Sequence, residues 1–264
     1  MNKRMLIICV SLCAVAILIG AFFDLGITQS LYLGDNAFSL ICEVLSQTFM
    51  TFLTAFCFLV LFENFKNKTS FAMTCLKVGF VFASFILVLY DFYKIYNAVW
   101  FLVCAVFASC GIVYLMWLLA RAIPEEKLPE YAKLSVKFII FIALIFVLNQ
   151  AVKYIWGRPR YTDLIATLTL EDYRPFWQPN FFSGYKSFYS GHTTAVCSIL
   201  PLVYLVNKTN YNAKIKSLIK VGIIGIILLT MLSRLMAGDH FLTDVAFAFL
   251  ISSLVSYFVF KKVK

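Results

Sequence analysis

Residues 134–160 read LSVKFIIFIALIFVLNQAVKYIWGRPR, an apolar run that passes directly into a cationic cluster. The apolar part, 134–152, is close to the roughly 20 residues that a helix needs to cross the hydrocarbon core of a bilayer. The part that follows carries Lys153, Arg158 and Arg160. This stretch predicts a membrane-spanning helix followed by a segment rich in positive charge.

The rest of the chain is similarly apolar. Of its 264 residues, 62% are hydrophobic and 14% are charged, whereas a soluble domain has about 25% charged residues. The sixth apolar stretch is the weakest, because it is short and contains Pro201. We predict an all-α, polytopic transmembrane helical bundle with about eight spans, which lie near 5–23, 44–62, 71–90, 98–120, 134–152, 192–206, 217–232 and 241–260.

The distribution of Lys and Arg predicts the orientation of these spans. Cations are common in the second, fourth and sixth loops and in the C-terminal tail, which places both termini in the cytoplasm. The first external segment, 24–43, has three acids and no Lys or Arg, and we interpret it as a partly amphipathic helix on the outer surface. A structural role is expected for it, and covering the site or guiding a lipid headgroup are the alternatives. We therefore expect an integral membrane protein, of a bacterial plasma (inner) membrane.

Another set of cations breaks this pattern and falls on the external side: Lys153, Arg158, Arg160, Arg174 and Lys186. Binding of phosphate would explain them. A long cation is otherwise expected to snorkel from a helix end, and we interpret Arg158 as a loop cation outside the site. The net charge of +10 is thus a sign of membrane topology and of a phosphate site, and no nucleic acid partner is expected.

Three polar clusters meet at this external face, at 153–160, 189–192 and 233–244. They contain both histidines of the chain, His192 and His240. His240 and Asp244 are four residues apart at the start of a helix and share a face, so the carboxylate can orient the ring. Positive charge for an oxyanion comes from Lys153, Arg160 and Arg234, and backbone amides come from Ser190-Gly191, which taken alone would be an ordinary helix cap.

In order and spacing, these clusters resemble the three motifs of the type 2 phosphatidic acid phosphatase superfamily. The first, Lys-x6-Arg-Pro, matches at Lys153 and Arg160, with Tyr161 in place of proline. The second, Pro-Ser-Gly-His, matches at 190–192, with Tyr189 in place of proline. The third, Ser-Arg-x5-His-x3-Asp, matches in full at Ser233, Arg234, His240 and Asp244.

The resemblance implies a role for each matched residue. His240 is the expected nucleophile, which forms a phosphohistidine, and Asp244 orients it. His192 is expected to protonate the leaving alcohol and later to activate water. The phosphate oxygens would be held by Lys153, Arg160, Ser190, Gly191 and Arg234. Asp239, next to the nucleophile, has no assigned role.

The resemblance also implies a fold and an activity. A six-helix phosphatase core is expected, and we divide the single membrane domain, 1–264, into N-terminal spans without motifs, 1–121, and a catalytic part, 134–260. The expected function is hydrolysis of a lipid phosphate or diphosphate, with a bell-shaped dependence of the rate on pH. No cofactor and no metal are expected, since the sequence has no HExxH, DxD or CxxC motif.

Two other functions remain open at this point. The same phosphohistidine could pass its phosphate to an alcohol or sugar, which would make the protein a phosphotransferase. A non-enzymatic membrane transporter or lipid-binding protein could use the same basic pocket. Besides a lipid phosphate, membrane lipids are the expected partners, and the sequence does not indicate the oligomeric state.

Overall fold

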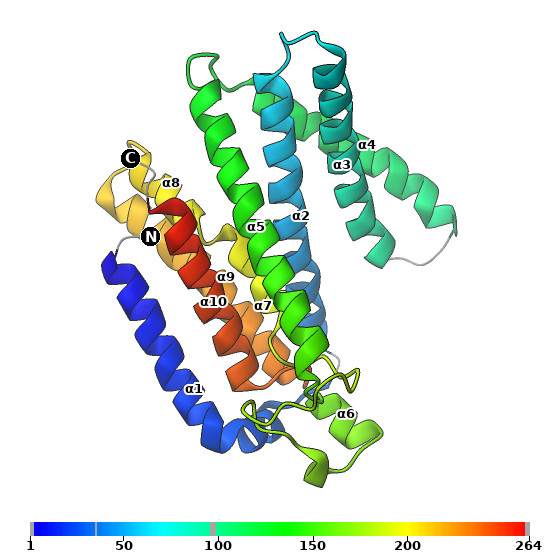
Figure 1. Ribbon diagram of the computed structural model, residues 1–264, viewed down its shortest axis with the longest axis vertical. Coiled ribbons are helices and arrows are strands. Elements are labelled where there is room, and N and C mark those ends of the chain that lie inside the picture. The colour runs from blue at the N-terminus through cyan, green and yellow to red at the C-terminus, as the bar shows by residue number, and fades with distance from the viewer. Residues whose placement is uncertain (1–2, 35, 96–98, 262–264) are drawn as a thin grey trace. The chain divides into compact units, whose positions relative to one another are not determined.

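The computed structural model describes residues 3–34, 36–95 and 99–261 (Figure 1). All regular elements in this described part are helices, which confirms the predicted all-α class. Seven of them are long and apolar enough to cross a membrane. The elements are α1 (Lys3–Leu31), α2 (Ala37–Asn64), α3 (Phe71–Ile95), α4 (Val99–Arg121), α5 (Leu128–Trp156), α6 (Tyr161–Ala166), η1 (Leu170–Asp172), α7 (Gly191–Val196), η2 (Cys197–Ile199), α8 (Leu202–Lys208), α9 (Ala213–Met236) and α10 (Leu242–Phe260).

The sixth apolar stretch differs from the other seven. It consists of α7, η2 and α8 in succession, and none of these pieces is long enough to span a bilayer alone. Pro201 directly precedes α8 and has no N–H to continue the hydrogen bonding of a regular helix. Val196, Cys197 and Leu200 are fully buried, so this interrupted segment belongs to the interior of the protein.

The prediction of a separate surface helix in segment 24–43 is wrong. Helix α1 continues to Leu31 and α2 begins at Ala37, so most of the segment extends the two neighbouring spans. Asp24 and Ser39 are both buried. These two polar side chains therefore lie in the interior, where they need partners, although Leu33 and Leu40 of the same segment are exposed.

The helices form two compact units, one made of Met1–Ser46 with Ala143–Lys264 and one made of Gln47–Ile142. In the first unit α1 packs along α10 (Figure 1). The late part of α1 meets the beginning of α10, since the Thr243 N–H donates to Asp24 Oδ1 at 3.0 Å. Helix α1 therefore packs with the motif-bearing helices. By its position in the sequence it belongs to the part without motifs, 1–121.

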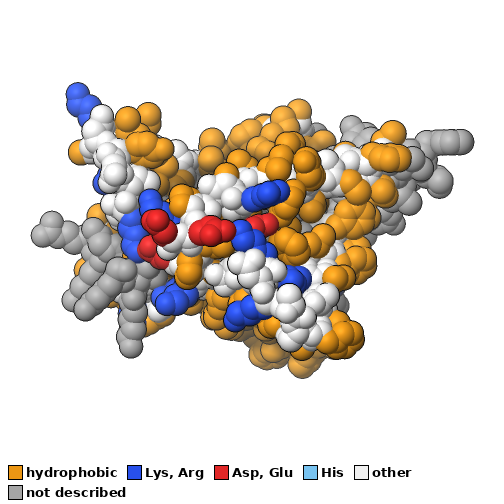
Figure 2. Space-filling model, turned by 90° about the horizontal axis from the view of Figure 1, so that it is seen from above, with side chains coloured by type: hydrophobic (Ala, Val, Ile, Leu, Met, Phe, Trp, Pro, Cys, Tyr) orange, Lys and Arg blue, Asp and Glu red, His pale blue; other side chains and the backbone are white. Residues whose placement is uncertain are grey.

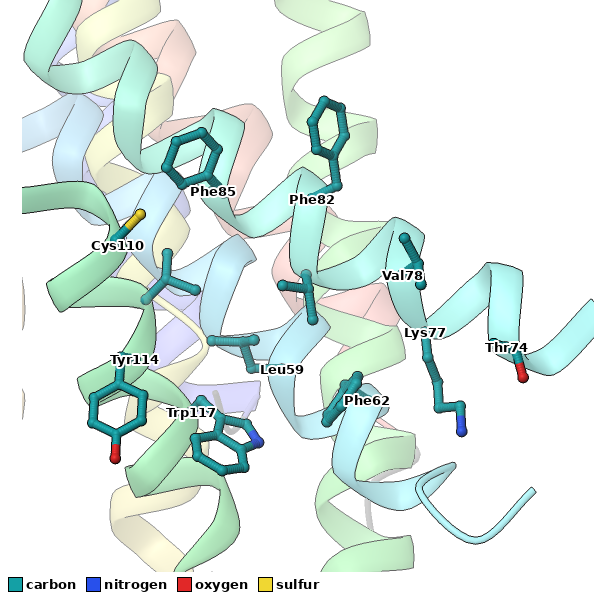
Figure 3. A pocket seen from close by; sticks show the side chains of 12 residues that line it. Leu59, Phe62, Thr74, Lys77, Val78, Phe82, Phe85, Cys110, Tyr114 and Trp117 are labelled. Atoms are coloured by element: carbon teal, nitrogen blue, oxygen red, sulfur yellow. The ribbon is translucent and has the colours of Figure 1, made fainter. Parts of the chain in front are cut away.

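The second unit has a hydrophobic core between α2, α3 and α4. Two hydrogen bonds hold polar side chains in this unit: Trp117 Nε1 donates to Glu63 Oε1 at 2.6 Å, and Ser84 Oγ donates to the Ala55 carbonyl at 3.1 Å. A pocket of about 740 Å³ opens between the same three helices (Figure 3). Its lining is almost entirely apolar, and Lys77 is its one cationic residue. The pocket has room for an alkyl chain but lacks the clustered cations that a phosphate requires.

The surface fits a bilayer. Many large hydrophobic side chains are exposed on the long helices, among them Phe22, Phe71 and Phe107. Figure 2 shows one face of the molecule, on which Lys and Arg are gathered with Asp and Glu and hydrophobic side chains lie around them. An exposed apolar surface of this extent is stable in lipid and unfavourable in water, so the chain is an integral membrane protein.

Candidate active site

The third motif forms a corner between α9 and α10 in the first unit. Helix α9 ends at Met236, and Gly238 then takes a positive φ of 72°. A Cβ at this position would lie 2.9 Å from the ring of Tyr32, so the close approach of that ring also requires glycine. The N–H groups of Asp239 and His240 both donate to the Arg234 carbonyl, at 3.2 and 3.3 Å. The turn thereby holds His240 beside the end of α9.

His240 and Asp244 face each other as their spacing predicts. Nδ1 of His240 lies 3.7 Å from Oδ2 of Asp244, and both side chains are buried. This distance is longer than a hydrogen bond, but catalytic contacts are often long before substrate binds. Burial lowers the pKa of His240 from 6.5 to about 4, so the ring is neutral at neutral pH.

The carboxylate of Asp244 is fixed in place by its other partners. Ser187 Oγ donates to Oδ2 at 2.6 Å, and the Phe241 N–H donates to the same oxygen at 2.9 Å. The second of these bonds also satisfies a free amide at the start of α10. A carboxylate held in this way has little freedom to turn away from His240.

Arg158 is not a loop cation, as the sequence analysis interpreted it, but a fully buried side chain. Its Nη1 lies 2.6 Å from Asp244 Oδ1, and its Nη2 lies 3.0 Å from Asp24 Oδ2. The guanidinium also lies 4.2 Å from the ring centroid of Phe241. A buried cation requires such pairing because it has lost its hydration. Arg158 therefore belongs to the site. It contacts Asp244, which in turn faces His240.

Asp24 brings α1 into the same network. Besides pairing with Arg158, it accepts hydrogen bonds from the Thr243 N–H and from the Thr243 hydroxyl. We call Asp24, Arg158, His240 and Asp244 the inner cluster. An acid near the end of the first apolar run was the only signal for Asp24 in the sequence, and nothing there indicated its distant partners.

A second group of charges lies around Arg234, which is itself buried. Arg234 Nη1 lies 3.0 Å from Glu43 Oε2 and 3.1 Å from Asp239 Oδ2. The other carboxylate oxygen of Asp239 lies 3.1 Å from Nη1 of Arg160. Asp239, which had no role assigned from its motif position, thus bridges two of the predicted phosphate-binding arginines.

His192 meets this group through α2. Its Nε2 lies 3.4 Å from Glu43 Oε1, and both side chains are partly exposed. We call Glu43, Arg160, His192, Arg234 and Asp239 the outer cluster. Glu43 belongs to no motif, and its position at the end of segment 24–43 gave no sign of a chemical role.

The second motif joins α5 to α7. Ser190 is buried, and its hydroxyl accepts a hydrogen bond from the Thr193 N–H at 3.3 Å, so it caps α7. The Ser190 N–H donates to the Asp244 carbonyl at 3.1 Å. Its role in phosphate binding stays a prediction, since both groups already have a structural partner.

Gly191 is where α5 comes nearest to this motif. A Cβ added to Gly191 would lie 3.2 Å from Lys153 Nζ and 3.4 Å from Asn149 Oδ1. Asn149, one turn before Lys153 on α5, donates to the Tyr189 carbonyl at 2.8 Å. A small residue at 191 therefore lets the Lys153 ammonium reach the second motif.

Tyrosines occupy the two positions where the motifs have proline. Tyr161 begins α6, and its ring packs edge-on against Tyr32 at a centroid distance of 5.0 Å. Tyr189 is buried and lies beside Phe188 at 6.0 Å. Aromatic packing therefore fixes the backbone at both positions, and neither substitution removes a charged group from the site.

The structure brings all eight predicted site residues together within one unit. The arrangement offers a buried neutral imidazole, a second histidine beside a carboxylate, and cations that can face an oxyanion. Within residues 3–34, 36–95 and 99–261, no group of three or more His, Cys, Asp or Glu side chains is placed to hold a metal ion. Metal independence of the reaction stays a prediction for a chelator experiment.

Comparison with known proteins gives one match. Residues 134–264 match the family model described as the PAP2 superfamily. This range contains all three motifs, but it does not include Asp24 or Glu43. No curated protein and no solved structure matches the chain.

Proposed function

The chain belongs to the PAP2 superfamily, and from this premise we propose that it is a membrane-embedded lipid phosphate or diphosphate phosphatase that works through a phosphohistidine. Members of this superfamily are generally phosphatases, which supports a hydrolase acting on phosphate esters. The observation that carries the finer proposal is the neutral, buried His240 held against Asp244, with the cations of the outer cluster close by.

The first step forms the phosphoenzyme. Because Nδ1 of His240 faces Asp244, Nε2 is the nitrogen that attacks phosphorus. The P–O bond to the lipid breaks as the P–N bond forms, and the leaving oxygen takes a proton from His192. Asp244 stabilises the charge that develops on the His240 ring.

The second step restores the enzyme. His192, now neutral, takes a proton from a water molecule, and the resulting hydroxide attacks phosphorus. The P–N bond breaks, inorganic phosphate leaves, and His240 is neutral again. In both steps Lys153, Arg160 and Arg234 would stabilise the equatorial oxygens, which is the main source of catalysis in phosphoryl transfer.

A lipid substrate is supported by the surface near the site. Tyr154 lies one residue beyond Lys153 on α5, and its ring contacts Phe182 at a centroid distance of 5.7 Å. Both rings are exposed, as are those of Trp177 and Phe181 in the following loop. Exposed aromatic side chains favour the interface between water and lipid. The phosphate site would thus open at the depth where lipid headgroups lie.

The distribution of Lys and Arg supports an extracytoplasmic site. If the N-terminus lies in the cytoplasm, α1 runs outward, and Asp24 near its far end marks the external face. The inner cluster, which includes Asp24, would then lie on that face in a plasma membrane. Labelling of an introduced cysteine in the 170–186 loop of intact cells tests this orientation.

Release of phosphate from a panel of lipid phosphates and diphosphates by the purified chain in detergent tests the function. We expect release by the wild type, with and without chelator, and none above background from His240→Ala. Glu125→Gln is the matched control, because Glu125 forms an exposed pair with Lys66 outside the site. Equal release by wild type and His240→Ala would refute the assigned nucleophile, and transfer to added alcohols in preference to water would indicate a phosphotransferase.

A further inference from the structure

The contacts of Glu43 go beyond the motifs of the family. We propose that Glu43, on α2 and outside the range that matches the family, is a positioning residue that holds His192 in its proton-donating form. The inference rests on the proposed function for its catalytic meaning, but its physical content is the interaction of one carboxylate with one imidazole. If Glu43 has this role, an N-terminal helix without motifs contributes to proton transfer in the reaction.

The geometry divides the carboxylate of Glu43 between two partners. Oε1 lies 3.4 Å from His192 Nε2, and Oε2 lies 3.0 Å from Arg234 Nη1. Arg234 is anchored by the Ser39 carbonyl, to which its Nη2 donates, and Ser39 is one turn before Glu43 on the same helix. The beginning of α2 is thereby fastened to α9, which fixes where the carboxylate of Glu43 stands.

Several charged groups surround His192, and they do not act in the same direction. Arg234 comes from α9, and Lys153 comes from α5 to the neighbouring Gly191. Both cations disfavour a positive charge on the imidazole. Asp239 from the α9–α10 turn and Asp244 from α10 favour that charge, but each is paired with an arginine. Glu43 places a carboxylate directly against the ring.

The inference predicts a distinctive set of kinetic changes for Glu43→Gln. Glutamine keeps the shape of the side chain but removes its charge, so His192 loses its proton more easily and fewer molecules can protonate the leaving oxygen. The carboxylate also stands beside a phosphate-binding arginine, where it repels the incoming phosphate. We therefore expect kcat to fall while KM is unchanged or lower, whereas general damage to the site would raise KM.

The first test is the dependence of kcat and kcat/KM on pH for wild type, Glu43→Gln and Glu125→Gln. We expect the alkaline limb of Glu43→Gln to move to lower pH by about one unit, the order of shift that one close opposite charge produces. Glu125→Gln should follow the wild type. An alkaline limb in Glu43→Gln that coincides with the wild type would overturn the inference.

The second test does not depend on turnover. The chain has two histidines, so NMR of the protein in detergent with ¹⁵N-labelled histidine gives two ring systems, which His240→Gln assigns. We expect the His192 ring of Glu43→Gln to titrate about one pH unit lower than in the wild type. The same midpoint in both proteins would overturn the inference whatever the activity. A lower midpoint in a protein that releases no phosphate would sustain the positioning role and refute the proposed function.

Discussion

The inner and outer clusters are built from the same residue types but differ in exposure and in how their charges are paired. In the inner cluster Arg158 stands between two carboxylates, and every member is at most 1% exposed. In the outer cluster Arg160, Asp239, Glu43 and His192 are 21–37% exposed, and Arg234 alone is buried. Buried ion pairs exchange partners at a high cost, and half-exposed ones do so easily.

This difference separates two tasks. In the inner cluster Asp24, Arg158 and Asp244 are paired with one another and fix the orientation of His240, which alone would meet the substrate. The outer cluster pairs its arginines with Asp239 and Glu43, and an arriving phosphate can compete with these carboxylates. Each cluster also takes one acid from the part of the chain before the matched range, Asp24 from α1 and Glu43 from α2. The N-terminal helices therefore complete both clusters.

Among the changes that separate the two clusters, the largest effect on activity is expected from Asp244→Asn. The change removes the charge that stabilises the His240 ring during attack, so kcat should fall by roughly ten-thousandfold. Asp24→Asn is the matched control, because it removes a charge from the same arginine but not from the face of His240. Phosphate release by the two variants measures the difference, and an equal loss in both would mean that Asp244 acts only through Arg158.

Arg158→Met and Arg160→Met compare how much the inner and the outer cluster contribute to the stability of the fold. Arg158→Met leaves two carboxylates buried without their cation, at an expected cost of about 3–5 kcal/mol. Thermal unfolding in detergent should show a clear fall of the midpoint, and the double variant Asp24→Asn/Arg158→Met should recover part of it. Arg160→Met, at a half-exposed position, should leave the midpoint almost unchanged. A similar fall of the unfolding midpoint in Arg158→Met and Arg160→Met would contradict the proposed difference in stability between the two clusters.

Arg160→Met should instead affect substrate binding. Arg160 can turn from Asp239 toward a phosphate, and the loss of one charge-assisted contact should raise KM by about tenfold. Phosphate release at varied substrate concentrations checks this. An unchanged KM with a lower kcat would place Arg160 with the residues that orient the nucleophile.

The smallest effect concerns acid pH. The nucleophile must be neutral, and burial lowers the pKa of His240 to about 4. Hence kcat/KM should decline only as the pH falls through about 4, well below the range in which a free imidazole is protonated. The folded pKa lies below the unfolded value of 6.5, so His240 contributes stability above pH 6.5 that is lost as the pH falls toward 4. An acid limb near 6.5 for His240 would mean that water reaches the inner cluster.

The sequence predicted those features that depend on local spacing. The apolar runs predicted the helices, and the i,i+4 spacing of His240 and Asp244 placed these two residues on one face. The proline and the short length also marked the sixth stretch as the weakest span, and it is the one that the structure interrupts. These patterns act over a few residues and leave a direct trace in the sequence.

The features that were missed depend on contacts between distant segments. Arg158 lies between Gly157 and Pro159, where a solvated loop cation looks the same as one that pairs with Asp24 and Asp244. Glu43 and Asp24 are acids at the ends of apolar runs, and their partners are far along the chain. Composition predicts neither contact, because each one arises from the packing of α1 and α2 against the motif-bearing helices.

Trapping of the phosphoenzyme is the most direct test of His240 as nucleophile. His192→Ala should accumulate the intermediate when the labelled substrate is an aryl phosphate, because this leaving group needs no proton and the variant then lacks only the base that activates water. Label should remain on His240 after an alkaline quench that preserves phosphohistidine, and the double variant with His240→Ala should carry none. Label on another residue, or none in His192→Ala when the wild type releases phosphate from the same substrate, would contradict the account.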